Sequence, residues 1–291
     1  MLIVERVTIV GVGLLGASLG LALKKRGIAR EIIGVGRKGS ESLKVAKKRG
    51  AIDRGVEDVA EGVKGSELVV LCTPVGMFEG MMKKMAGSLG EEAIVTDVGS
   101  TKAQVMAWAE KYLPAGSFVG SHPMAGSEKS GPAAARDDLY HGAVCLMCAG
   151  GKSKSGRQKA VEEIWKAVGM KTVWMDAKVH DKVVAGISHL PHAAAFALAA
   201  TVGRWPESFV AAGGGFCDTT RIASSDIAMW RDIFLTNKSA VVKAIGAMQK
   251  ELAGLKKAIA GGRAKEIETR LEKARATRDA VMAARNSRDR R

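Results

Sequence analysis

His122 lies in the segment GSHPMAGSEKSG, residues 120–131, where small and polar residues offer little apolar surface to bury. An unperturbed imidazole has a pKa of about 6.5, so a histidine can accept a proton near neutral pH. A histidine on such a loop suits general base catalysis, and the plainer alternative is a histidine in an ordinary turn. Its position relative to the predicted strands and helices decides between the two.

A glycine pattern near the start of the chain indicates a dinucleotide site. Gly11, Gly13 and Gly16 have GxGxxG spacing, directly after the apolar run 6–11 and at the start of the helical pattern 14–27. Here the first glycine makes a tight turn, the second lets the backbone approach a pyrophosphate, and the third lets helix and strand pack closely. The helix N-terminus then faces the anion. The predicted cofactor contacts in this turn are Gly11, Gly13, Leu14, Leu15 and Gly16.

The end of the second apolar run, 31–36, bears on the choice of cofactor. NAD sites usually place Asp or Glu there, about 20 residues past the glycines, to bind the ribose. This chain has Gly36 followed by Arg37 and Lys38, so an acid is missing and cations are present. A 2′-phosphate is therefore favoured, with Arg37 as its contact. NADP is the preferred cofactor, NAD remains possible, and Arg37 in an ordinary solvated loop is the alternative.

Short apolar runs alternate with helical patterns through the first part of the chain, which predicts a parallel sheet with helices on both faces. Ligands bind such sheets beyond the carboxyl ends of the strands. Thr73 and Pro74 follow the third run, Ser100 follows the fourth and His122 follows the fifth. We therefore expect His122 at the cofactor edge and count Thr73 and Pro74 as cofactor contacts. Ser100 is expected to bond the imidazole or the cofactor amide, or to cap the following helix, or both.

The pattern changes after residue 177. Ala-rich helical stretches follow without a strand signal, and the chain ends in a charged helix with a basic end. We predict an α/β domain over residues 1–177 and an all-helical domain over residues 178–291. The longest apolar run, 183–203, is long enough to span a bilayer. Because it contains two His, a Ser and a Pro, we expect a buried or subunit-contact helix there, and no membrane association.

Composition limits the partners. The net charge is +15, but the basic residues are scattered in short clusters and aromatic residues are only 4%. These features favour an anionic small molecule over nucleic acid. Cys145 and Cys148 form a CxxC within a predicted strand, where residues three apart face opposite sides. We expect reduced cysteines, no metal site and a cytoplasmic protein.

The helical part offers a second group of polar residues. His189 and His192 are three residues apart on one helix face, which suits a polar patch facing the cleft better than a metal site, because no carboxylate lies nearby in the sequence. Arg221 has the planar fork that binds a carboxylate. A structural ion pair of Arg221 with Asp218 or Asp226 is an equal alternative.

Five segments together resemble the prephenate/arogenate dehydrogenase family of tyrosine biosynthesis. They occur in the family's order and cover most of residues 5–240: GVGLLGASLGLALKKRG, DVGSTK, GSHPMAGSEKSG, ISHLPHAAAFAL and GFCDTTRIASSDIAMWRDIF. The resemblance implies a Rossmann-type doubly wound sheet followed by an all-helical dimerisation domain. It also implies a homodimer with the active site in the interdomain cleft, and the oxidative decarboxylation of prephenate to 4-hydroxyphenylpyruvate with NAD(P)⁺.

The resemblance also implies residue roles. His122 is the base on the 4-hydroxyl, and Ser100 orients it and contacts the 4-hydroxyl or the nicotinamide. Ser127 and Glu128 lie at the mouth of the site, and His192 and Arg221 hold the substrate.

Three alternatives stay open. Cys217 replaces a cation common among relatives, which leaves arogenate, or both substrates, as an option. A β-hydroxyacid dehydrogenase or imine reductase would use a base such as Lys182. A non-catalytic dinucleotide sensor that binds DNA is a more distant option.

Overall fold

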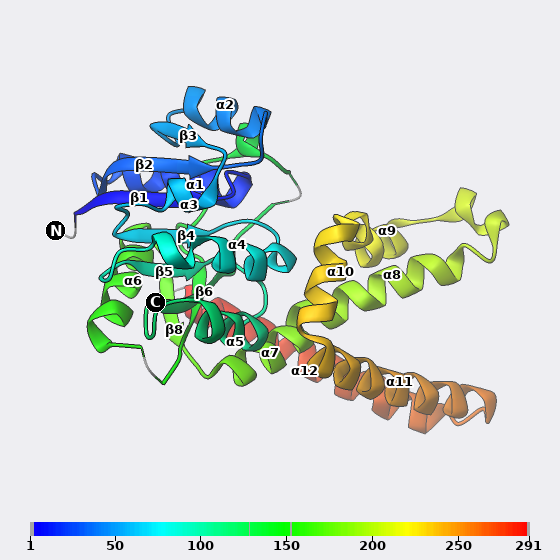
Figure 1. Cartoon of the computed structure of the whole chain (residues 1–291). Helices are drawn as coiled ribbons and strands as arrows, with labels where there is room; N and C mark the ends of the chain where they lie inside the picture. Colours follow the sequence, from blue (N-terminus) through cyan, green and yellow to red (C-terminus); the bar gives the residue numbers. More distant parts are fainter. Residues whose placement is uncertain (1–2, 128, 152, 290–291) are drawn as a thin grey trace. The chain divides into compact units, whose positions relative to one another are not determined.

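The computed structural model describes residues 3–127, 129–151 and 153–289, without the side chains of 287–289. One sheet of eight strands has the order β3-β2-β1-β4-β5-β6-β7-β8 (Figure 1). The strand order reverses direction at β1, as in doubly wound dinucleotide-binding folds. The strands are β1 (Val4–Val10), β2 (Ala29–Val35), β3 (Arg54–Val56), β4 (Leu68–Leu71), β5 (Ile94–Asp97), β6 (Phe118–Pro123), β7 (Val144–Ala149) and β8 (Lys171–Trp174).

The sheet is buried on both faces, as near-continuous apolar strands predict. Ile9 of β1 belongs to one apolar cluster and the next residue, Val10, belongs to the other. In β4, Val70 packs in the first cluster, whereas Val69 and Leu71 pack in the second. Because successive side chains of a strand point to opposite faces, these two clusters are the two layers of core that enclose the sheet.

Two details of the sheet differ from the sequence prediction. β7 runs antiparallel to β6, with His122 opposite Leu146, so the sheet is mostly rather than wholly parallel. Among the described residues between β6 and β7 the one helical element is the 3₁₀-helix η3 (Pro132–Ala134), and a return without a crossover helix is typical of antiparallel pairs. The strand β3 was not predicted, because its three residues RGV carry no apolar pattern.

The helices of the sheet domain alternate with the strands. They are α1 (Leu14–Lys25), α2 (Glu41–Lys48), α3 (Val59–Gly62), η1 (Val75–Met77), α4 (Phe78–Met85), η2 (Ala86–Ser88), α5 (Ala103–Tyr112) and α6 (Ser155–Ala167). The prediction of an α/β doubly wound sheet is confirmed.

The rest of the chain is helical, as predicted. Its elements are α7 (Ala177–Val184), a π-helical turn η4 (Ala185–His189), α8 (Leu190–Val202), η5 (Pro206–Ala211), α9 (Gly214–Thr220), η6 (Arg221–Ser224), α10 (Ile227–Thr236), α11 (Lys238–Ala260) and α12 (Ala264–Asp289). By its contacts, the chain divides into the compact units Met1–Lys238 and Ser239–Arg291. The helices α7–α10 thus pack in one unit with the sheet, and the boundary at residue 177 stays a prediction.

The second unit consists of α11 and α12 joined by a short turn, where Gly262 has a φ of +59°. Arg270 of α12 pairs with Glu251 of α11 and with Glu266 of its own helix. Glu251 is exposed, and Arg270 and Glu266 remain partly open to solvent, so these pairs contribute little to stability.

The continuous helical stretch Ala177–Val202 is long and apolar enough to cross a membrane by length and composition. However, it carries buried polar groups, including His180, Asp181 and His189. Each of these three side chains is hydrogen-bonded to another residue of the same unit. Such contacts are typical of packing against protein over the first half of the stretch, whereas in α8 Ala195 is the buried residue.

Candidate active site

The glycine turn after β1 has the geometry that its spacing predicts. Gly11 has a φ of +98°, a conformation that L side chains rarely adopt, and a Cβ there would lie 2.7 Å from the backbone N of Thr73. A Cβ on Gly16 would overlap the carbonyl oxygen of Gly11. Both positions therefore require glycine, Gly11 because the turn approaches the residues that follow β4 and Gly16 because α1 approaches the turn itself.

The start of α1 fits the phosphates of a dinucleotide. Gly13 is the N-cap residue and forms no side-chain cap, and the space where its Cβ would stand is open. The first N–H groups of a helix lack intrahelical partners and attract anions. Thr73, at the end of β4, has a buried Oγ1 without a hydrogen-bond partner in the described chain. An unpaired buried hydroxyl is costly unless a ligand completes it, so these residues fit the cofactor.

The segment after β2 leaves two cations exposed. The side chains of Arg37 and Lys38 are exposed, and within the described residues neither forms an ion pair. Ser40 caps α2 by accepting a hydrogen bond from the backbone N–H of Ser42. The loop is therefore held by its own cap, which leaves Arg37 available to a ligand.

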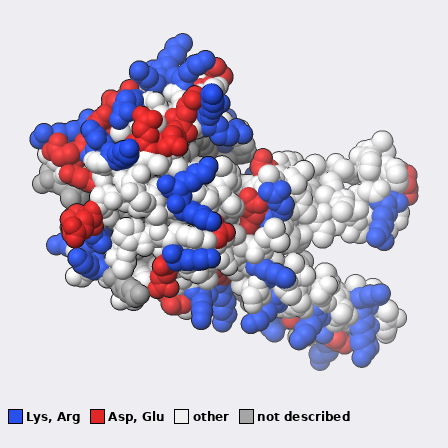
Figure 2. All heavy atoms as spheres, in the orientation of Figure 1, with Lys and Arg blue, Asp and Glu red and all other residues white. Residues whose placement is uncertain are grey.

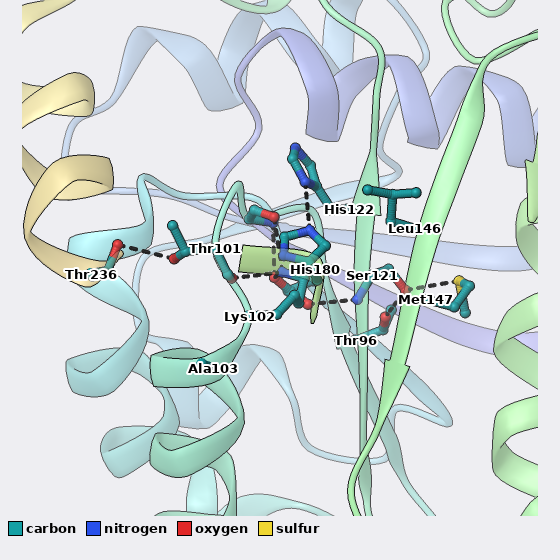
Figure 3. Close-up of polar contacts among 12 residues, drawn as sticks. Thr96, Thr101, Lys102, Ala103, Ser121, His122, Leu146, Met147, His180 and Thr236 are labelled. Carbon is teal, nitrogen blue, oxygen red and sulfur yellow. Dashed lines mark hydrogen bonds and ion pairs between the residues drawn. The ribbon is translucent and has the colours of Figure 1, made fainter. Parts of the chain in front are cut away.

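His122 belongs to β6 itself, as its next-to-last residue, rather than to the loop that follows. Its side chain is 8% exposed. Nδ1 of His122 lies 2.9 Å from Nε2 of His180, on α7 (Figure 3). Its other ring nitrogen, Nε2, has no hydrogen-bond partner in the described chain. A single nitrogen of this buried imidazole is therefore left for a substrate.

The hydrogen bonds continue from His180 to a carboxylate. Nδ1 of His180 lies 2.8 Å from Oδ1 of Asp181. The carboxylate of Asp181 accepts hydrogen bonds from the backbone N–H groups of Lys102, at 2.7 Å, and Ala103, at 2.9 Å. These amides begin α5, where a negative charge is stabilised by the helix dipole. The series joins β6, α7 and the start of α5.

Burial controls the protonation of the two histidines. Desolvation is the main cause that holds the pKa of His122 well below its usual range, and the nearby His180 and Lys102 lower this pKa further. Burial also lowers the pKa of His180, against the opposing effect of Asp181. Both rings are therefore neutral near pH 7, and a neutral His122 is the form that accepts a proton.

A buried ion pair shapes the loop between β5 and α5. Nζ of Lys102 lies 2.5 Å from Oδ2 of Asp97, and both side chains are fully buried. Nζ also donates to the carbonyl oxygens of Gly99 and Thr101, while Asp97 accepts from the backbone N–H of Ser121. The pair thus fixes the loop on which Ser100 lies and the residue before His122.

Ser100 does not play the part predicted for it toward His122. It forms no hydrogen bond with either ring nitrogen of His122 in the described chain, and the Nδ1 atom is bonded by His180 instead. The N-cap residue of α5 is Lys102, so the alternative of a Ser100 cap is also wrong. A contact of Ser100 with the nicotinamide amide or the substrate stays a prediction.

A second polar group surrounds Trp230 of α10. The ring of His192 stacks on Trp230 with centroids 3.6 Å apart, and His189 meets it edge-on at 5.9 Å. Asn237 donates from Nδ2 to the carbonyl oxygen of Asp181 and lies 3.1 Å from Nδ1 of His189. The side chains of Trp230 and His189 each leave one buried ring nitrogen without a partner in the described chain. Unpaired donors of this kind suit a polar ligand.

Comparison with known proteins identifies the family. The family model described as "Prephenate dehydrogenase, nucleotide-binding domain" matches residues 19–174, and "Prephenate dehydrogenase, dimerization domain" matches residues 176–273. The chain belongs to the prephenate dehydrogenase family. The resemblance seen in the sequence is confirmed.

Individual relatives agree with this placement. Prephenate dehydrogenase of Bacillus subtilis is 38% identical over 82% of this chain and 66% of its own length. A crystal structure of prephenate dehydrogenase from A. aeolicus with hydroxyphenyl propionate and NAD⁺ has a TM-score of 0.89 at 38% identity, covering 95% of this chain and 98% of that one. Synechocystis arogenate dehydrogenase has a TM-score of 0.81 at 26% identity, covering 95% and 100%.

Three substrate residues predicted from the family resemblance can be located, and one cannot. His192 is half-buried against Trp230, and its Nδ1 donates to the carbonyl oxygen of Ser188. Arg221 is exposed and pairs with neither Asp218 nor Asp226 in the described chain, so the structural ion pair is wrong. Ser127 is exposed and accepts from the backbone N–H of Lys129. Glu128 lies outside the described residues.

The base expected for the rival β-hydroxyacid dehydrogenase class lies away from this network. Lys182 is exposed on α7, whereas His180 and Asp181 of the same helix are buried. Cys145 and Cys148 are free and buried in β7, and no metal-binding group of His, Cys, Asp and Glu occurs among the described residues. Lys182 therefore takes no part in the hydrogen bonds that join His122, His180 and Asp181.

Proposed function

We propose that this protein is a prephenate dehydrogenase of tyrosine biosynthesis, which converts prephenate and NAD(P)⁺ to 4-hydroxyphenylpyruvate, CO2 and NAD(P)H. The observation that carries the proposal is the placement of His122. It is a buried, neutral imidazole with one unpartnered nitrogen. Its strand, β6, lies beside β5, which leads into the Ser100 loop, and β4 separates β5 from β1, which leads into the cofactor-binding turn.

When bound, the nicotinamide supplies the acceptor for the hydride that leaves C4 of the substrate ring. Nε2 of His122 takes the proton of the 4-hydroxyl as C4 is oxidised. The ring carboxylate leaves as CO2, its bonding electrons enter the ring, and His122 returns the proton to the oxygen of the new phenol. Because aromatisation drives the reaction, the protein mainly has to position the substrate and supply one base.

A cation and an imidazole in the helical part suit a dianionic substrate. Arg221 is free to form a bidentate contact with a carboxylate, and His192 presents its Nε2 beside the face of Trp230. We assign these two residues to substrate binding, Ser127 to the mouth of the site, and Ser100 to the 4-hydroxyl or nicotinamide. The net charge of +15 also favours the approach of anions.

Prephenate is favoured over arogenate by the relatives. The prephenate dehydrogenases of Bacillus subtilis and A. aeolicus are each 38% identical to this chain, against 26% for the arogenate dehydrogenase of Synechocystis. Arogenate, alone or beside prephenate, is the alternative, because the two substrates differ only in an amino or keto side chain.

NADP is favoured over NAD on the residues after β2. Gly36, Arg37 and Lys38 provide two exposed cations and no acid for a ribose 2′-hydroxyl. The A. aeolicus structure at 38% identity was solved with NAD⁺, which keeps NAD as the alternative.

A homodimer formed through the helical domain is part of the proposal. The part of the chain around α8 and α9 carries few charges on the face shown in Figure 2, in contrast to the mixed charges of the sheet domain. Large apolar side chains are exposed there: Ile187, Leu198, Trp205, Phe209, Val210 and Ile227. Exposed large apolar side chains that gather in one region are typical of an interaction site, and the matched family domain is described as a dimerization domain. The four free cysteines suit a cytoplasmic protein.

Absorbance of the reduced cofactor tests the function. The purified protein is given prephenate or arogenate with NAD⁺ or NADP⁺, and initial rates are compared for the four combinations. The proposal expects the highest kcat/KM with prephenate and NADP⁺. Turnover with arogenate alone would replace the substrate, and cofactor binding without turnover in all four would favour a non-catalytic dinucleotide-binding protein.

A further inference from the structure

Three side chains form a hydrogen-bonded series that ends at the base. Asp181 bonds Nδ1 of His180, and Nε2 of His180 bonds Nδ1 of His122, at 2.8 and 2.9 Å. His180 is fully buried and Asp181 is 5% exposed. Neither residue takes part directly in the transfer of a proton between the substrate and Nε2 of His122.

The carboxylate fixes the direction of these hydrogen bonds. Asp181 accepts from two backbone N–H groups at the start of α5, which is a site that stabilises the ionised carboxylate. An ionised carboxylate can only accept hydrogen bonds. Nδ1 of His180 must therefore carry a proton, and this N–H donates a hydrogen bond to Oδ1 of Asp181.

The neutral state of His180 decides the direction of its hydrogen bond with His122. With its one proton on Nδ1, the ring presents a lone pair on Nε2. Nε2 of His180 must then accept a hydrogen bond, and the group 2.9 Å away is Nδ1 of His122. His122 thus carries its proton on Nδ1, and its Nε2 is left with a free lone pair.

We infer that His180 is a positioning residue that holds His122 in the Nδ1-protonated tautomer, with Asp181 setting the tautomer of His180. The inference rests on the proposed function, because only a proton acceptor requires Nε2 of His122 to be unprotonated. The opposite tautomer would direct an N–H at the substrate hydroxyl and block proton removal. The hydrogen bond made by one ring nitrogen decides the state of the other.

The series also stabilises the charge that forms during the reaction. When Nε2 of His122 takes a proton, the imidazolium keeps its Nδ1–H bonded to His180, and a hydrogen bond from a charged donor is stronger than a neutral one. The negative charge of Asp181 lies one ring further on. Because Asp181 and His180 belong to α7 whereas His122 belongs to β6, this arrangement exists only when α7 is packed on the sheet domain.

Two substitutions of His180 distinguish a role in positioning His122 from a role in folding. His180→Phe keeps a ring but removes the acceptor, whereas His180→Gln keeps an acceptor oxygen near the place of Nε2. We expect His180→Phe to lower kcat with prephenate by ~10²-fold, a loss on the scale of general base catalysis, with KM little changed. His180→Gln should recover at least ~10-fold of that loss, since each 1.4 kcal/mol of hydrogen bonding corresponds to about a factor of ten. Equal kcat in the folded His180→Phe variant and the unmodified protein would overturn the inference.

A spectroscopic measurement on the unmodified protein needs neither turnover nor a folded variant. Imidazole ¹⁵N NMR of protein with labelled histidine distinguishes protonated from unprotonated ring nitrogens, and loss of one signal set in His122→Asn assigns His122. At pH 7 we expect Nδ1 of His122 protonated and Nε2 unprotonated. A protonated Nε2 would overturn the inference. This result stands apart from the proposed function, which is tested by turnover of prephenate and not by the tautomer of His122.

Asp181→Asn tests the first link. The amide can turn its NH2 group toward His180 and force a proton from Nδ1 to Nε2, which then opposes the Nδ1–H of His122. We expect the same loss of kcat as in His180→Phe and the same change in the ¹⁵N signals of His122. Replacing the exposed His141 by Asn is the matched control, and it should change neither. An unchanged ¹⁵N spectrum in folded Asp181→Asn would remove Asp181 from the series.

Discussion

Nζ of Lys102 and Oδ2 of Asp97 form an ion pair with no exposed side-chain surface. The same Nζ donates to the carbonyl oxygens of Gly99 and Thr101, on either side of Ser100. A buried charge that loses its partner is far more costly than the intact pair is favourable. The conformation of the loop between β5 and α5 therefore depends on both Lys102 and Asp97.

Lys102→Met tests this dependence. We expect the free energy of unfolding to fall by about 3–5 kcal/mol, because Asp97 is left as an unpaired buried charge. Urea unfolding followed by circular dichroism measures the change. Combining Lys102→Met with Asp97→Asn should recover part of the loss, and a single variant as stable as the unmodified protein would contradict the account of the pair.

Arg221→Ala tests substrate binding. A charge-assisted bond to a carboxylate contributes about 1.5–3 kcal/mol, so KM for prephenate should rise by about 10-fold or more while kcat changes little. Initial rates over a range of prephenate concentrations measure both constants. Arg231→Ala is the matched control, because this exposed arginine already pairs with Asp232. If KM is equal in both variants, Arg221 does not bind the substrate.

Arg37→Ala tests the choice of cofactor. Without the guanidinium, a 2′-phosphate loses a charge-assisted contact, and KM for NADP⁺ should rise by about 10-fold. KM for NAD⁺ should stay the same, because NAD⁺ has no phosphate at that position. Arg30→Ala, which removes an exposed arginine near Glu5, should alter neither constant. Parallel changes for both cofactors would refute the contact with the 2′-phosphate.

The pH dependence of kcat/KM follows from the burial of His122. Desolvation lowers the pKa of this imidazole, so its neutral form persists to lower pH than in a solvated histidine. Activity requires the neutral form, and the acid limb of the kcat/KM profile reports the free enzyme. We therefore expect the midpoint of that limb well below about 6.5, the ordinary value for histidine. A midpoint above this value would show that a different group controls the rate.

Much of the fold was predictable because its signals are local. The alternation of apolar runs and helices, and the glycine spacing at Gly11 and Gly16, are properties of short segments. The antiparallel β7 was missed because strand direction depends on how the chain returns between β6 and β7. The three-residue β3 was missed because it is too short to show a pattern.

The site was predictable only in part, for a different reason. His122 could be identified from the strand that precedes it, since the carboxyl ends of parallel strands meet at one edge. Its partner His180 lies 58 residues further along the chain, and that pairing depends on how α7 packs against β6. The adjacent residues His180 and Asp181 are visible in the sequence, but nothing in their spacing shows that they face His122. Asn237 and Trp230 likewise join the site only through the packing of α10.

The central claim is that His122 removes the proton of the substrate hydroxyl. Steady-state kinetics of His122→Asn with prephenate and NADP⁺ test it most directly, with cofactor binding measured separately by the quenching of tryptophan fluorescence. We expect kcat to fall by at least ~10²-fold while cofactor affinity is retained, the loss expected for a general base. Turnover close to that of the unmodified protein would contradict the assignment of His122 as the base.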